Sequence, residues 1–202
     1  SCWRTSRASS RRGSSLTLGG MKKLKLPLVL RPRAMHLNAG ESKPIFVEDT
    51  IVAHENGGEI IRTALHIEKA CTDLIAAYFF PTDDPLKEQF EGYILETSWC
   101  SFESKRKLFF MACDALQLWR DDERRRLEEA FSKVLRYRNA FAHGFIYQNG
   151  EKLFVAYFTG GKQCDLLDDQ FWDTLERNIR FTFDLVHAMT RRLRELRKSK
   201  NA

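Results

Sequence analysis

The sequence feature that most constrains the fold is a long run near the C-terminus in which apolar side chains recur at alternating steps of three and four residues. That spacing places them on one face of an α-helix, whose period is 3.6 residues. We therefore predict a helix from about Asp169 to Lys198, with one side buried against other helices. The recurring positions are Trp172, Leu175, Ile179, Thr182, Val186, Met189, Leu193 and Leu196.

Three earlier helices are predicted from apolar spacing and from residues that favour helix ends. The first runs from about Glu59 to Phe80, between "HENGG", which breaks the chain, and a proline. A shorter helical piece covers about Leu86 to Glu96. The third runs to Trp119 and is capped by Ser101 or Ser104, because a serine oxygen accepts hydrogen bonds from the first free backbone N–H groups.

A fourth helix fills "DDERRRLEEAFSKVLRYRNAFAH", which opens with acids suited to a helix N-terminus and is followed by Gly144, a residue that favours helix ends. The next stretch, "FIYQNGEKLFVAYF", has two β-rich runs around Asn149 and Gly150, which predicts a hairpin. The fold class is therefore all-α: an antiparallel four- to five-helix bundle with one short β-hairpin after the fourth helix.

The chain is expected to hold one domain, at residues 51–199, preceded by two other segments. Residues 1–20 are rich in Ser, Arg and Gly, and we interpret them as a non-native or disordered leader, with a transit peptide as the alternative. Residues 21–50 contain three prolines, typical of an extended arm. The leader holds four arginines and no acid, so only two of the six net positive charges belong to the rest of the chain. Bulk charge is therefore weak evidence for nucleic acid.

Several function classes find no support in the sequence. The five cysteines form no CxxC pair, which suits free thiols in the cytoplasm, and no spacing of histidine and cysteine suggests a metal site. No apolar run of membrane-spanning length exists, and neither a P-loop nor a dinucleotide fingerprint nor a nucleophile elbow occurs. We expect no cofactor, no metal and no membrane.

Arg138 is placed where the fourth helix calls for an apolar side chain. With Leu127 at zero and about 100° per residue, Phe131 falls near 40°, Val134 near 340° and Arg138 near 20°. The same count on the first helix puts Glu68 near 340° in a stripe with Ile61, Leu65, Ile75 and Phe79. A buried guanidinium needs a partner, so we predict that Glu68 and Arg138 meet; a purely structural ion pair is the alternative.

His143 follows Arg138 by five residues, which in a continuous helix points the two side chains about 140° apart. If the helix unwinds at residues 142–144, the imidazole can turn back toward the arginine. The alternative is a histidine that only caps the last carbonyls of the helix.

The stretch "RNAFAHG" resembles the motif of the HEPN superfamily, in which four to six residues separate an arginine from a histidine and the first of them is polar. Arg138, Asn139 and His143 match it, and the resemblance covers about residues 50–198. It implies a helical domain that dimerises with both motifs facing one cleft. Many such domains are metal-independent endoribonucleases, often toxins or defence effectors, while others are binding modules. Acidic residues of the first helix often complete such sites, which makes Glu68 a candidate.

The expected activity is therefore RNA cleavage without metal, by attack of the 2′-hydroxyl on the adjacent phosphate to give 2′,3′-cyclic phosphate ends. Histidine suits general acid–base catalysis near neutral pH, and arginine suits the charge of the intermediate. Arg136 is expected to bind RNA at the cleft rim. Expected partners are RNA, a second copy, and an antitoxin or a nucleotidyltransferase. The alternative is a non-catalytic dimeric module that binds RNA, nucleotide or a partner protein, and the basic tail, residues 191–198, is interpreted as a solvated helix end.

Overall fold

The computed structural model describes residues 23, 45–81, 84–150 and 152–200. This part of the chain is mainly helical with a small antiparallel sheet, which confirms the expectation of a mainly α fold. The elements are α1 (Ile45–Phe79), α2 (Pro85–Phe90), the π-helical η1 (Glu91–Leu95), α3 (Phe102–Ala115), α4 (Glu123–His143), β1 (Phe145–Asn149), β2 (Lys152–Phe158), β3 (Lys162–Leu166) and α5 (Asp169–Lys200).

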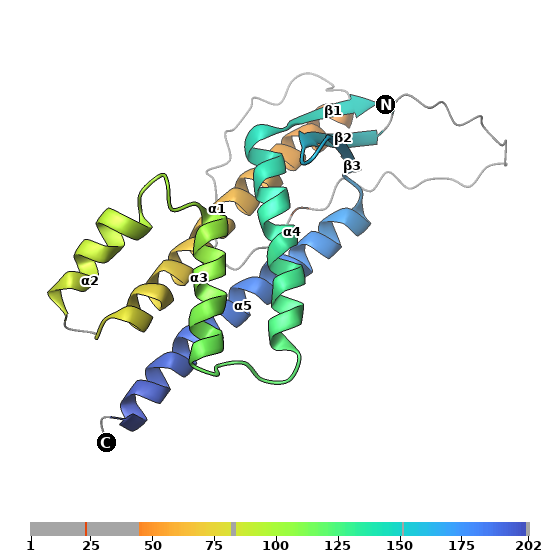
Figure 1. The fold of residues 1–202 in the computed structure, drawn as a ribbon. Helices are drawn as coiled ribbons and strands as arrows, with labels where there is room; N and C mark the ends of the chain where they lie inside the picture. The colour runs from red at the N-terminus through yellow and green to blue at the C-terminus, as the bar shows by residue number, and fades with distance from the viewer. Residues whose placement is uncertain (1–22, 24–44, 82–83, 151, 201–202) are drawn as a thin grey trace, which may run out of the picture.

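Two long helices, α1 and α5, form the back of the molecule in the view of Figure 1, and α3 and α4 lie in front of them. Helix α1 contacts α3, α4 and α5, so its sides are buried by three neighbours. The apolar face predicted for α5 is confirmed, because seven of the eight recurring positions are buried and the last is half-buried. The largest fully buried side chains include Trp172, Phe109, Phe131, Ile60 and Ile67.

The sheet packs at the C-terminal end of α4 and has the order β1-β2-β3, with both pairs antiparallel. Asn149 pairs with Lys152 next to Gly150, whose φ of 63° suits a tight turn. The central strand β2 buries most of its length and contacts α4. The third strand, β3, was not predicted: it pairs with β2 across a turn in which Gly160 and Gly161 have φ of 63° and 148°.

Helix α1 begins earlier than predicted, so the expected break at "HENGG" is wrong. Gly57 and Gly58 lie inside the helix, and a Cβ added to Gly57 would lie 2.8 Å from Cδ1 of Phe141. The glycine therefore lets α4 approach closely instead of ending the helix. Residues 45–50, expected as part of the arm, are helical as well. The predicted leader and, apart from Lys23, the rest of the arm lie outside the described residues.

The ends of α3 and α4 follow local signals. Ser101 caps α3, its Oγ accepting a hydrogen bond of 3.2 Å from the backbone N–H of Ser104. The helix ends at Ala115, before the predicted Trp119. At the end of α4 the N–H of Gly144 donates to the Ala140 carbonyl at 2.9 Å, as expected for a terminating glycine.

Across the residues that the structure describes, no helix combines the length and apolarity needed to span a membrane. The described cysteines, Cys71, Cys100, Cys113 and Cys164, are all free, as predicted, and the first three are buried.

Candidate functional site

Arg138 occupies the inward face of α4, as the sequence predicts. The residues that share this face, Leu127, Phe131 and Val134, are fully buried, and Arg138 is half-buried. Its Nε is buried and has no hydrogen-bond partner among the described residues, while Nη1 donates to Oδ1 of Asn139 at 2.9 Å. Within the described part of the chain, the guanidinium therefore has one hydrogen-bond partner, which is neutral, and has donors to spare.

His143 is exposed and is the last residue of α4, which continues as a helix to this point. The helix therefore does not unwind before His143, which was the condition for the imidazole to turn back toward Arg138, and the two side chains leave the helix about 140° apart. Asn139 lies between them, about 100° from Arg138 and about 40° from His143, one turn before the histidine. Around the helix, Asn139 therefore lies between Arg138 and His143 and is closer to the histidine.

Glu68 does not pair with Arg138, contrary to prediction. Its Oε1 lies 2.6 Å from Nζ of Lys105 on α3, in a contact where the lysine side chain is 8% and the glutamate side chain 18% exposed. The predicted apolar face of α1 is also rotated: Ile61 is half-buried and Leu65 is 50% exposed. The buried face is centred about 90° away, because small residues complete it. Its members are Ile60, Ala64, Ile67, Cys71 and Leu74.

Arg136, the expected RNA contact, is held by the sheet. Its Nε donates to the Tyr157 hydroxyl at 2.6 Å and its Nη2 to Oδ2 of Asp165 at 3.2 Å. The hydroxyl in turn donates to the same carboxylate oxygen at 2.6 Å. Burial, helped by the hydrogen bond to Asp165, raises the pKa of Tyr157 to about 12, so this hydroxyl stays protonated. Arg136 therefore fastens α4 to β2 and β3 while part of its side chain remains exposed.

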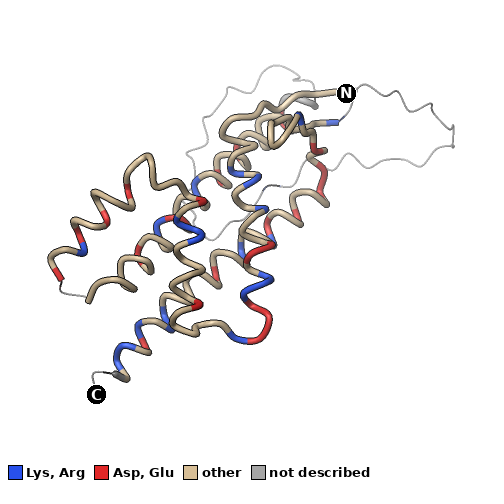
Figure 2. Tube along the Cα trace, viewed as in Figure 1, with Lys and Arg blue, Asp and Glu red and all other residues tan. Residues whose placement is uncertain are grey.

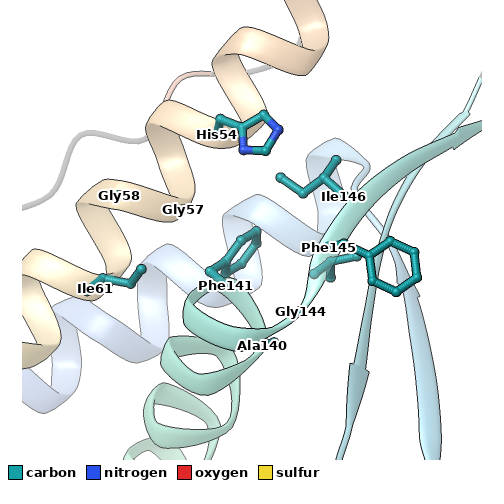
Figure 3. Close-up of a pocket in the computed structure, with 10 residues that line it drawn as sticks. His54, Gly57, Gly58, Ile61, Ala140, Phe141, Gly144, Phe145 and Ile146 are labelled. Atoms are coloured by element: carbon teal, nitrogen blue, oxygen red, sulfur yellow. The ribbon is translucent and has the colours of Figure 1, made fainter.

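A cavity of about 250 Å³ lies beside the end of α4, between that helix, α1 and β1. Figure 3 shows His54 of α1 facing Phe141 and Ile146 across it. Its other lining residues are glycine, alanine or apolar, and Arg138, Asn139 and His143 do not line it. A space with one titratable side chain and apolar walls does not suit a phosphate, so we do not place the motif's chemistry there.

The basic end of α5 is visible as a cluster of positive positions near the C-terminus in Figure 2. Two of its arginines are bound to the rest of the fold: Arg192 holds both carboxylate oxygens of Glu123 at 2.6 and 2.8 Å, and Arg197 donates to the Phe80 carbonyl at 3.0 Å. The hydrogen bond from Arg192 lowers the pKa of Glu123 below its ordinary value. This tail is therefore partly a structural clamp.

Three residues of these networks were missed: Lys105, Tyr157 and Asp165. Lys105 could have been found by the count that revealed Arg138, because it lies about 60° from Phe102 and about 40° from Phe109 on the buried face of α3. Asp165 lies on β3, whose sequence shows no alternation of apolar and polar residues, and the role of Tyr157 on β2 depends on that carboxylate. Within the described ranges, no group of three or more His, Cys, Asp or Glu side chains could hold a metal ion.

Comparison with known proteins adds no assignment, since no family model matches the chain and neither a curated protein nor a solved structure is significantly similar to it.

Proposed function

We propose that this chain is a HEPN-type helical bundle that acts as a metal-independent endoribonuclease, with each reaction site built from two copies. The observation that carries the proposal is the set of three polar side chains near the end of α4. His143 is exposed, Asn139 lies one turn before it, and Arg138 donates a hydrogen bond of 2.9 Å to Asn139. A solvent-facing imidazole and a guanidinium with free donors, both near the end of the same helix, are the two groups that RNA cleavage needs.

The chemistry requires no metal because RNA carries its own nucleophile. A base removes the proton of the 2′-hydroxyl, the oxygen attacks the adjacent phosphorus, and an acid protonates the departing 5′-oxygen. Histidine, with an ordinary pKa of about 6.5, serves as base or acid near neutral pH. The planar fork of Arg138 is suited to the added negative charge of the pentacoordinate phosphorus. The products are a 2′,3′-cyclic phosphate and a 5′-hydroxyl.

The direction of the side chains supports the involvement of two copies. Because Arg138 and His143 leave one continuous helix about 140° apart, one chain presents them poorly to a single phosphate. In a symmetric dimer with the ends of both α4 helices in one cleft, Arg138 of one copy and His143 of the other can face the same phosphate. A cytoplasmic toxin or defence effector, with an antitoxin or a nucleotidyltransferase as partner, is the proposed setting.

The second candidate is a non-catalytic module of the same architecture that binds RNA, a nucleotide or a partner protein. One observation favours it: Glu68, the expected fourth member of the site, is paired with Lys105 at 2.6 Å. In this reading Arg138 and Asn139 recognise an anion, and His143 caps the helix.

The test is incubation of purified protein with mixed RNA in EDTA, next to His143→Ala and a matched His66→Ala variant. His66 is an exposed histidine of α1 and has no part in the proposed site. The endoribonuclease requires cleavage that resists EDTA, produces cyclic phosphate ends, disappears in His143→Ala and persists in His66→Ala. Absence of cleavage by the wild-type protein, with retained RNA binding, assigns the chain to the second candidate. A solution mass near twice 23.6 kDa supports the shared site.

A further inference from the structure

A groove between α4 and α5 is lined by basic and aromatic side chains that the motif does not use. Two adjoining cavities of about 330 and 290 Å³ form it and share Lys133, Thr174 and Asn178. From Arg126 to Arg136 it follows α4 for about 15 Å. The two helices pack directly against each other beneath it.

The charge of the groove is positive. Its lining includes four cations, against two acids, Glu129 and Asp168. Glu129 accepts a hydrogen bond of 2.9 Å from Arg125, and Asp168 accepts one of 2.7 Å from the backbone N–H of Phe171 and keeps its charge. Two of the four cations are themselves ion-paired, Arg126 with Asp122 at 3.6 Å and Arg136 with Asp165 at 3.2 Å. The lining cations are Arg126, Lys133, Arg136 and Arg177.

Two of these cations are available to an anionic ligand. Lys133 is exposed and forms no ion pair within the part of the chain that the structure describes. Arg177 donates at 3.3 Å to the Asp173 carbonyl and at 3.4 Å to the Thr174 hydroxyl, neither of which carries a charge. They come from opposite walls, α4 and α5, so a phosphate chain along the groove would pass between them.

Aromatic rings lie at both ends of the same groove. The half-buried Phe181 has the guanidinium of Arg126 over its face, 4.8 Å from the ring centroid, and Tyr137 meets Phe171 edge to face at 5.0 Å. A flat cation on an aromatic face is a surface on which a nucleobase stacks, and single-stranded nucleic acids are bound by rows of such surfaces beside basic groups.

We propose that the α4–α5 groove binds single-stranded RNA, with Lys133 and Arg177 on its phosphates and a base stacked at Arg126 and Phe181. The choice of RNA rests on the proposed function. The upper end of the groove, at Arg136, lies on nearly the same side of α4 as His143, about 20° away and about 10 Å along the helix axis. The groove thus extends the contact between strand and protein beyond the site of cleavage.

The experiment measures fluorescence anisotropy of a labelled 2′-O-methyl RNA dodecamer, which lacks the nucleophile and so cannot be cut. Lys133→Ala/Arg177→Ala should weaken binding at least tenfold and reduce the slope of log K against log salt by about 1.4, or about 0.7 for each lost phosphate contact. Phe181→Leu, which keeps an apolar side chain, should weaken binding about tenfold by removing the stacking face. Circular dichroism verifies that each variant is folded.

The matched control is Lys107→Ala/Arg194→Ala, which removes one lysine and one arginine, both exposed, outside the groove. Equal weakening by the control, unchanged affinity of the groove variants, or no effect of Phe181→Leu each overturns the proposal. If the wild-type protein binds RNA in the groove but does not cleave it, only the proposed activity is refuted; if it cleaves RNA but the groove does not bind, only this inference is refuted.

Discussion

The contact between α1 and α3 and the end of α4 both place a charged side chain on an apolar helix face, and they resolve the charge in different ways. At the first, Lys105 meets the carboxylate of Glu68 at 2.6 Å in a contact where the lysine is buried and the glutamate is half-buried. At the second, Arg138 hydrogen-bonds only to the neutral amide of Asn139 among the described residues, and His143 at the end of the same helix is exposed. A charge that is paired with an opposite charge stabilises the fold, whereas a charge that keeps free hydrogen-bond donors near solvent can bind a ligand.

The largest expected effect on stability is at the ion pair between Lys105 and Glu68. Lys105→Met leaves the Glu68 carboxylate buried without its cation, and we expect the free energy of unfolding to fall by about 3–5 kcal/mol. Denaturant titration measures it. Lys107→Met on the same helix, where the lysine is exposed, should change stability by less than about 0.5 kcal/mol. Similar values for the two variants would show that the buried pair has no special role.

The next effect concerns the residue that ends α4. A Cβ at Gly144 would collide with the backbone oxygens of Ala140 and Ala156, so Gly144→Ala should cost about 1–3 kcal/mol. Gly58→Ala is the matched control, because Gly58 is helical and has open space around it, and it should stabilise by about 0.5–1 kcal/mol. Thermal unfolding that ranks the two variants in the opposite order would contradict the described geometry.

The ion pair at the other end of α4 should give a smaller, pH-dependent effect. Glu123→Gln should lower stability by about 1–2 kcal/mol at neutral pH, because Arg192 loses a bidentate partner. Since the folded-state pKa of Glu123 is lowered, its contribution is complete above the ordinary glutamate pKa of about 4.3 and is lost as pH falls through the lowered value. The wild-type and variant proteins should therefore converge in acid; a constant difference would contradict the assignment.

The smallest effect on stability is predicted for Arg138. Arg138→Met leaves no carboxylate unpaired, so unfolding should change by less than about 1 kcal/mol. RNA cleavage should nevertheless fall by at least about 100-fold, because the charge of the intermediate loses its guanidinium. A large loss of stability would make Arg138 a structural residue like Lys105 and remove the contrast between the two regions.

Much of the helical layout was predictable, and its failures have physical causes. The face of α5 and the position of Arg138 followed from regular apolar spacing, and the cap at Ser101 followed from local chemistry. The start of α1 was missed because Gly57, a residue of low helix propensity, lies inside the helix, where the lack of a side chain leaves room for Phe141. The partner of Glu68 was missed because counting only bulky residues rotated the expected face of α1. Sequence spacing gives the phase of one helix, but pairing between helices also depends on the neighbours.

The central claim, that Arg138 of one copy and His143 of another act on one phosphate, is tested most directly by mixing two inactive variants. Arg138→Ala and His143→Ala are combined in equal amounts under conditions in which subunits exchange, and EDTA-resistant RNA cleavage is measured. Half of the dimers would then be mixed, each with one intact site of two, so the account predicts recovery of about a quarter of wild-type activity. Two inactive variants that remain inactive after verified exchange would contradict it.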